Sequence, residues 1–166
     1  MILKEESTEQ KLRGAYYTPL KLAEKMVDFF KKDASIKSIL EPSCGDGVFV
    51  DALIETQFLT QNKKVTAIEI EKNEAKKLGE KLKDNPNVSV VNGDFFEFYQ
   101  KCKDINKYDL ILGNPPYIRY QYLEEKQRTE MSEILTSHGM KANKLINTWV
   151  GFMVACVHML SDNGKI

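Results

Sequence analysis

The sequence has little cysteine, little histidine and no long hydrophobic run, and each shortage excludes a class of protein. Its three cysteines lie more than fifty residues apart and there are only two histidines, which fits neither a disulfide framework nor a zinc cluster. The longest apolar run, at 149–160, is too short to cross a bilayer, and residues 1–10 are polar, unlike a signal peptide. We therefore expect a soluble intracellular protein with no membrane contact and no metal site.

An excess of charge of one sign is also missing. The chain has 24 Lys and Arg and 24 Asp and Glu among 166 residues, so its net charge is +0. Its overall field therefore cannot attract a polyanion, and any contact with nucleic acid must be local or supplied elsewhere. The hydrophobic content of 42% and the charged content of 29% are ordinary for a folded protein. Length and composition together predict one domain over residues 1–166.

Segments with helical and strand-like periods alternate along the chain. Apolar spacing predicts helices at 20–32, 48–54, 71–84 and 144–160, and strands at 38–40, 65–70, 88–91 and 108–113. The connections are long enough for helical crossovers, which require parallel strands buried on both faces. The predicted fold class is therefore α/β, with a doubly wound, mostly parallel sheet. Residues 162–166 resemble a turn into a further strand, so we expect a domain truncated before its last strands.

Polar residues follow each predicted strand, at the edge where ligands bind in open parallel sheets. They are the segment 41–47, Glu69, the pair Asp94 and Phe95, and the segment 114–117. Three of these four sets carry an acidic side chain. Because the carboxyl ends of parallel strands meet at one edge of the sheet, the sequence predicts a single acidic pocket.

The glycine-bearing loop after the first strand favours one cofactor over others. Gly45 and Gly47 permit a tight turn and a close approach of backbone to ligand. A dinucleotide-binding loop would have a third glycine where Val50 stands, and would not place Glu41 and Asp46 beside a pyrophosphate. S-adenosylmethionine, which carries an ammonium and a sulfonium centre but no phosphate, suits this acidic rim.

The next two strand ends suit the nucleoside part of the same cofactor. Glu69 is placed to accept hydrogen bonds from both ribose hydroxyls. Asp94 could accept from the adenine amino group while Phe95 stacks on the ring. The alternative is that each acid is only a helix cap or a turn former. That alternative explains any one of them, but not matched chemistry at successive strand ends.

Asn114-Pro115-Pro116-Tyr117 is the most specific stretch of the chain. Two prolines fix the backbone and remove two donors, which leaves carbonyl oxygens and the Asn114 amide directed at the crevice. Hydrogen bonds from a planar amino group to the Asn114 side-chain oxygen and the Pro115 carbonyl would free its lone pair to accept a methyl group. Tyr117 offers a face on which a flipped base can stack. The alternative is a rigid turn with a surface tyrosine.

These motifs together resemble the gamma-type N6-adenine DNA methyltransferases of bacterial restriction-modification systems. The resemblance extends from about Lys11 to the end of the chain, and includes Gly-Ala-Tyr-Tyr-Thr-Pro at 14–19 and Glu-Pro-Ser-Cys-Gly-Asp-Gly-Val-Phe at 41–49. The continuation at 118–120 is similar to fused restriction-and-modification enzymes. The resemblance implies a Rossmann-like fold, S-adenosylmethionine as cofactor, DNA as partner and the bacterial cytoplasm as location. The family's target-recognition region would lie beyond Ile166.

The resemblance also implies a set of site residues. Those of the catalytic motif are Asn114, Pro115, Pro116 and Tyr117. Those expected to bind the cofactor, with 17–19 at its methionine end, are Tyr17, Thr18, Pro19, Glu41, Pro42, Cys44, Gly45, Gly47, Glu69, Ile70, Asp94, Phe95 and Asn114. Asp46 stands where the family more usually has serine, and Arg119 is the expected DNA contact.

Smaller features each have two interpretations. The segment 118–147 mixes basic and aromatic residues with four glutamates, which fits either a phosphate clamp or a solvated helix and loop. Within it, Gly139 suggests a mobile lid. The Lys and Glu run at 71–83 is typical of a solvated helix face. Trp149 could contact the cofactor or fill the core, and Cys44, His138 and His158 lack the partners of a nucleophilic triad.

Two other functions remain open at this point. Similar Asn-Pro-Pro-Tyr sites methylate a protein glutamine or ribosomal RNA, although the motif at 17–19 and the Pro-x-Cys-Gly loop favour DNA. Asparagine at 114, instead of serine, also argues against cytosine-N4 methylation. The second is a catalytically silent module that binds the cofactor or a partner subunit.

Overall fold

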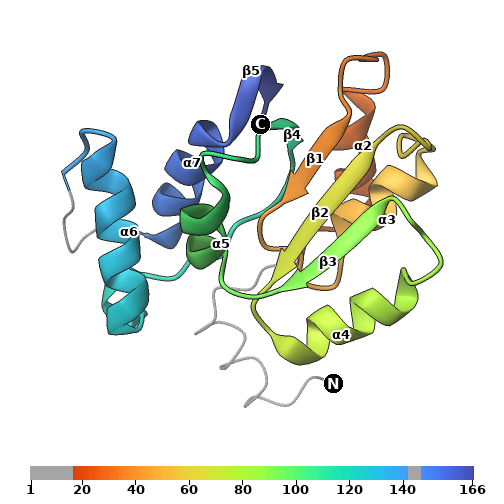
Figure 1. The fold of residues 1–166 in the computed structure, drawn as a ribbon. Helices are drawn as coiled ribbons and strands as arrows, with labels where there is room; N and C mark the ends of the chain where they lie inside the picture. The colour runs from red at the N-terminus through yellow and green to blue at the C-terminus, as the bar shows by residue number, and fades with distance from the viewer. Residues whose placement is uncertain (1–16, 142–146) are drawn as a thin grey trace.

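The computed structural model describes residues 17–141 and 147–166 as an α/β fold around a parallel sheet. The sheet has five strands in the order β3-β2-β1-β4-β5, and every pairing is parallel (Figure 1). The strands are β1 (Ser38–Glu41), β2 (Lys64–Glu69), β3 (Val88–Asn92), β4 (Tyr108–Ile111) and β5 (Leu160–Lys165). The sheet confirms the predicted Rossmann-like, doubly wound architecture.

Strand β1 occupies the middle of the sheet, where the direction of winding reverses. Ile39 is in register with Val65 of β2 on one side and with Leu110 of β4 on the other. The chain therefore builds one half of the sheet from β1 to β3 and then returns past β1 to add β4 and β5. In open α/β sheets this switch point opens a crevice at the carboxyl ends of the strands.

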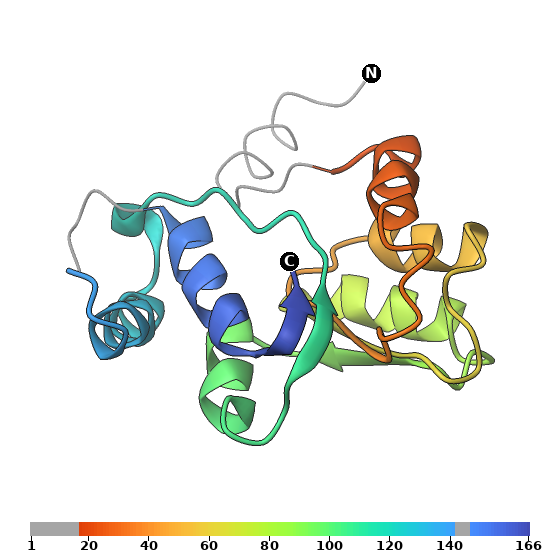
Figure 2. The same cartoon turned by 90° about the horizontal axis from the view of Figure 1, so that it is seen from above.

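Helices cover both faces of the sheet, because its strands are apolar on both sides. One face carries α2 (Leu20–Asp28), α3 (Val48–Glu55) and α4 (Lys72–Lys81). The other carries α5 (Phe95–Cys102), α6 (Glu125–Ser137) and α7 (Thr148–His158). Figure 2 shows the two groups on opposite sides of the strands. The core accordingly has two halves, one on each face.

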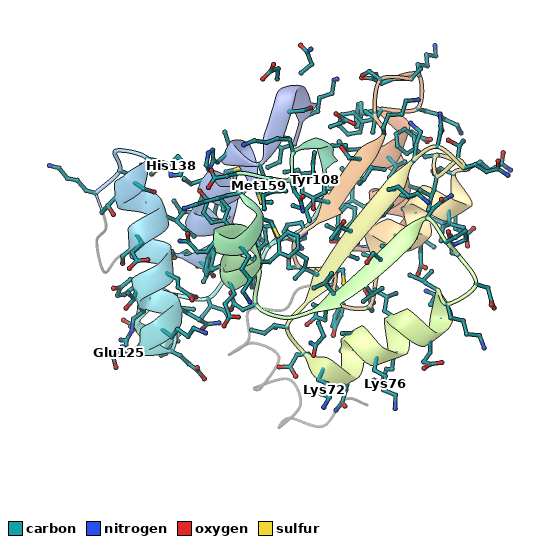
Figure 3. All side chains as sticks on the ribbon, in the orientation of Figure 1. Lys72, Lys76, Tyr108, Glu125, His138 and Met159 are labelled. Carbon is teal, nitrogen blue, oxygen red and sulfur yellow. The ribbon has the colours of Figure 1, made fainter. Side chains whose placement is uncertain are left out.

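Side-chain directions follow this layering. Figure 3 shows Lys72 and Lys76 directed away from the sheet, whereas Tyr108 and Met159 lie in the interior beside β4. The solvated helix face expected over 71–83 is therefore confirmed, on a helix that is shorter at both ends than predicted. Across 17–141 and 147–166, no helix combines the length and apolar composition that a membrane span requires.

The end of the chain differs from the prediction. The expected turn at 162–165 is the edge strand β5, and α7 ends at His158 rather than at 160. Asp162, Asn163 and Gly164 are typical turn residues, but Gly164 is needed inside this strand for a different reason. A Cβ there would lie 2.7 Å from the carbonyl oxygen of Tyr108, so the glycine allows β5 to pack closely against β4. Residues 144–146 of the expected helix lie outside the described part of the chain.

The sequence did not predict that helix α6 packs against neighbouring helices. Its apolar residues Met131, Ile134 and Leu135 are fully buried against α5 and α7, so it is more than a solvated helix. Gly139 adopts φ +75°, and the amides of Gly139 and Met140 donate to carbonyls of the last turn of α6. This glycine ends a helix. A lid role for it remains untested.

Candidate functional site

A cleft of about 650 Å³ opens at the carboxyl ends of the strands. Its volume is in the range of small-molecule and cofactor sites. Most of the residues expected to bind a ligand line it: Tyr17, Thr18, Glu41, Pro42, Cys44, Gly45, Glu69, Ile70, Asp94, Phe95, Asn114 and Pro116. Glu69 and Asn114 therefore open onto one cavity, although they come from strands on opposite sides of β1.

Some expected site residues lie beside the cleft instead of lining it. Pro19, Gly47, Pro115 and Tyr117 are next to lining residues in the chain, and the side chain of Arg119 is exposed. Gly14, Ala15 and Tyr16 of the first motif lie outside the described residues. Trp149 is exposed on α7 and does not line the cleft, so neither expectation for it holds.

The loop from β1 to α3 depends on its two glycines. Gly45 and Gly47 have φ +54° and +83°, a region that favours glycine. A Cβ at Gly47 would lie 2.4 Å from a methyl carbon of Leu78 on α4, so this glycine lets α3 start close to α4. Gly45, in contrast, lines the cleft, and its amide is directed at Glu69.

Glu69 links this loop to the end of β2. Its Oε2 accepts a hydrogen bond from the Gly45 amide at 2.7 Å, and its Oε1 accepts one from the Glu71 amide at 2.8 Å. The side chain is buried and lines the cleft. A carboxylate has about four acceptor positions, so these two bonds orient Glu69 and leave it able to accept hydroxyl donors from a ligand. The loop-fixing role was not predicted.

Glu41 brings a carboxyl group into the same cleft, and one of its two oxygens has no hydrogen-bond partner among the described residues. It is 2% exposed, and its Oε2 accepts no hydrogen bond there. Burial raises the pKa of this carboxyl well above its usual range, and the charges of Asp46 and Asp51 raise it further. The Ser43 hydroxyl is buried and likewise without a described partner. Buried polar groups without partners are rare in folded proteins, and a cationic ligand would satisfy this carboxylate.

Cys44 is buried next to these acids. Burial raises the pKa of its thiol far above the usual range, and the charges of Glu41 and Glu69 add to the effect. A thiolate is therefore disfavoured, which agrees with the prediction that this cysteine is no nucleophile. In the ranges 17–141 and 147–166, no group of three or more His, Cys, Asp or Glu side chains is arranged to hold a metal ion.

Asp94 caps a helix and also lines the cleft. Its Oδ1 accepts from the amides of Phe96 and Glu97, which begins α5, and its Oδ2 accepts from Gln127 Nε2 of α6 at 2.9 Å. The helix-cap alternative is thus correct for this acid, without removing it from the cleft. Phe95 is buried, with its ring stacked 4.7 Å from that of Phe152 on α7. Gln127 was missed because the packing of α6 was not predicted.

The segment after β4 starts beside the acidic loop, because β4 pairs with β1, and both line the cleft. The Asn114 Nδ2 atom is 3.4 Å from the Thr18 hydroxyl, which brings the first motif and the Asn-Pro-Pro-Tyr segment together. Behind Asn114, the Pro116 carbonyl accepts a hydrogen bond from the hydroxyl of Thr148, the first residue of α7. Thr148 is buried and was not predicted, since nothing in the sequence connects it to a loop about thirty residues earlier.

Comparison with known proteins gives consistent matches. Residues 7–166 match the family described as Eco57I restriction-modification methylase. The chain is 30% identical over 150 residues to the type II methyltransferase M.AccI of Acinetobacter calcoaceticus, a match that covers 90% of this chain and 26% of that protein. It therefore spans about a quarter of the length of this relative.

Two solved structures share the fold. The type I restriction-modification system methyltransferase subunit from Streptococcus thermophilus aligns with a TM-score of 0.68 and 17% identity, over 90% of this chain and 33% of that one. A putative class I S-adenosylmethionine-dependent methyltransferase from Listeria monocytogenes aligns with a TM-score of 0.67 and 11% identity, over 91% of this chain and 45% of that one. At these identities the likeness concerns the fold alone.

Proposed function

Since the chain belongs to the Eco57I restriction-modification methylase family, we propose that it is the cofactor-binding and catalytic part of a DNA methyltransferase. The reaction is transfer of a methyl group from S-adenosylmethionine to the N6 amino group of an adenine flipped out of the duplex. The observation that carries the proposal is the shared cleft, which acidic residues at the ends of β1 and β2 line together with Asn114.

The residues of the cleft fit the proposed cofactor. The Oε2 atom of the buried Glu41 carboxylate lacks a described partner and suits the ammonium group of the methionine end. Glu69 is oriented by two backbone amides to accept the ribose hydroxyls, and Asp94 with Phe95 forms the side of the cleft expected for adenine. When bound, S-adenosylmethionine supplies an electrophilic methyl group.

The acceptor side of the cleft is built for a planar amino group. The Asn114 side-chain oxygen and the Pro115 carbonyl accept hydrogen bonds from the two N–H groups of the adenine amine, which draws its lone pair out of conjugation. Held in this way, the nitrogen would be able to accept the methyl group that bound S-adenosylmethionine would supply, with S-adenosylhomocysteine as the leaving group. The nitrogen becomes acidic only after it has gained the methyl group, so its proton then passes to solvent and no strong base is needed.

The test is an assay of the complete gene product with radiolabelled S-adenosylmethionine and three acceptors: adenine-containing DNA, a peptide-chain release factor and ribosomal RNA. We expect label in DNA, recovered as N6-methyladenine by mass spectrometry. Asn114→Ala should lower the rate by roughly 100-fold or more, while calorimetry shows that it still binds the cofactor. Label in release factor or in ribosomal RNA, and none in DNA, would identify that acceptor as the substrate in place of DNA. Cofactor binding with no label in any acceptor would identify a silent module.

A further inference from the structure

Thr148 makes three hydrogen bonds to Pro116 of the Asn-Pro-Pro-Tyr motif and to Ile118, the residue after the motif. Its Oγ1 lies 2.7 Å from the Pro116 carbonyl oxygen and accepts a hydrogen bond from the Ile118 amide at 2.9 Å. Its own amide donates to the Ile118 carbonyl at 2.9 Å. The hydroxyl also lies 3.0 Å from the Ile118 carbonyl oxygen, and we assign its single proton to the shorter contact, with Pro116. The hydroxyl therefore both donates and accepts, and it is 2% exposed.

The two groups held by this hydroxyl stand on either side of Tyr117. The Pro116 carbonyl belongs to the peptide plane before Tyr117, and the Ile118 amide belongs to the plane after it. Only the φ and ψ angles of Tyr117 relate these planes, so one hydroxyl bonded to both restricts both angles. These two angles set the direction in which the Tyr117 side chain leaves the backbone, next to the lining residues Pro116 and Ile118.

The residues next to Tyr117 show why the hydrogen bonds of the Thr148 hydroxyl matter. The preceding prolines fix their own φ angles, so fewer backbone rotations remain in the chain before Tyr117. The tyrosine side chain is 48% exposed, so packing restrains only about half of its surface. Thr148, in contrast, is anchored in α7 and has a stiff, β-branched side chain.

Helix capping does not account for Thr148. The cap of α7 is Asn147, whose Oδ1 accepts from the Trp149 amide, so the threonine hydroxyl is not needed to begin the helix. Arg119 and Asn147 also form an isolated antiparallel bridge, which brings the two segments together without restricting Tyr117. Among the described contacts, the threonine hydroxyl lies within 3.0 Å only of atoms of Pro116 and Ile118. Its next neighbour, Asn147 Oδ1, is 3.3 Å away.

The geometry points to Thr148 as a positioning residue that aims Tyr117 at the flipped base. The inference rests on the proposed function and deepens it, because it adds a residue from α7 to the acceptor side of the site. Thr148 also lines the cleft, but its hydroxyl is already bonded to the loop. Its effect on methyl transfer should therefore pass through Tyr117.

The experiment compares Thr148→Val, which keeps the shape but cannot form either hydroxyl bond, with Thr148→Ser, which keeps the hydroxyl. We expect the valine variant to lose roughly 10- to 100-fold in kcat/KM for the acceptor, with cofactor affinity within about twofold of wild type. The serine variant should retain most of the activity. Thr136→Val is the matched control, because its hydroxyl bonds only to carbonyls of its own helix α6.

Two further measurements separate positioning from general damage. Hydrogen exchange should be faster at the Ile118 amide in the valine variant while amides in β1 and β4 keep their protection. In a Tyr117→Ala background, Thr148→Val should reduce transfer by less than about twofold more. Wild-type transfer rates in Thr148→Val, or equal losses in the valine and serine variants, would overturn the inference. An inactive wild type would instead count against the proposed function.

Discussion

At the scale of single residues, burial of the Glu41 carboxyl lowers the stability of the fold while no cationic ligand is bound, although the same group suits such a ligand. A carboxyl group that is buried beside Asp46 and Asp51 loses hydration and gains repulsion, both of which raise its pKa. The folded protein then holds a proton that the unfolded chain releases. Glu41 contributes most to stability below its ordinary pKa of 4.5, and that contribution is lost as the pH rises through the raised value of the folded state.

We therefore expect Glu41→Gln to raise the free energy of unfolding near pH 8 by about 1–3 kcal/mol, since glutamine keeps the shape without the charge. The gain should shrink as the pH falls through 4.5, because below this value Glu41 becomes protonated in the unfolded state as well. Urea denaturation at several pH values measures it, and Glu55→Gln, at an exposed position on α3, serves as the control. A variant less stable than wild type at pH 8 would contradict this explanation. The same change should weaken cofactor binding, because the ammonium loses its counter-charge.

Glu69 differs from Glu41, because both of its carboxylate oxygens already accept hydrogen bonds, from the Gly45 and Glu71 amides. We expect Glu69→Ala to weaken the binding of S-adenosylmethionine by about 1–3 kcal/mol, through the loss of charged hydrogen bonds to the ribose. Titration calorimetry of the folded variant measures the effect, with Glu80→Ala on the exposed side of α4 as the control. Wild-type affinity in a folded Glu69→Ala protein would remove this residue from the site.

At the scale of elements, α6 connects to the cleft through one polar contact. The Gln127 side chain donates to Asp94 Oδ2 at 2.9 Å, while Lys126 pairs with Glu97 on the exposed side. Apolar burial of Met131, Ile134 and Leu135 holds the helix in place. The helix therefore orients a cleft carboxylate that already caps α5.

This arrangement predicts a modest effect for Gln127→Ala. Loss of one hydrogen bond to a charged group should weaken cofactor binding by about 0.5–1.5 kcal/mol, or roughly two- to tenfold in Kd. The helix content should not change, because the apolar face of α6 remains. Calorimetry and circular dichroism measure the two quantities, and Gln61→Ala, in an exposed loop, is the control. Unchanged affinity would mean that Asp94 is held well enough by α5 alone.

The prediction of elements from sequence succeeded where local chemistry and tertiary packing agree. The strands β1 to β4 are short apolar runs between turn residues, so their positions were predicted to within about two residues. Strand β5 was missed because Asp162, Asn163 and Gly164 favour turns in isolation. Only the close approach of β5 to the Tyr108 carbonyl explains the glycine. The packing of α6 was missed because polar residues surround its few apolar positions.

At the scale of the whole molecule, the cleft was predictable because topology brings distant strand ends to one edge. Alternating helix and strand patterns predicted the edge, and the residues after each strand then predicted most of the lining. Two other lining residues and their contacts were not predictable. Thr148 and Gln127 act on residues about thirty positions away, and a threonine or glutamine in a helix carries no local signal of such a partner.

The central position of β1 affects the order in which the strands of the sheet pair during protein synthesis. The amides of Lys37 and Ser38 donate to the Asp109 carboxylate, and the separation between Ser38 and Asp109 is 71 residues. A nascent chain emerging from the ribosome can pair β1 with β2 early. The opposite edge of β1 has no neighbouring strand until β4 has been translated. Closing so long a loop is slow compared with forming local helices. The binding crevice is therefore among the last features of this domain to take shape.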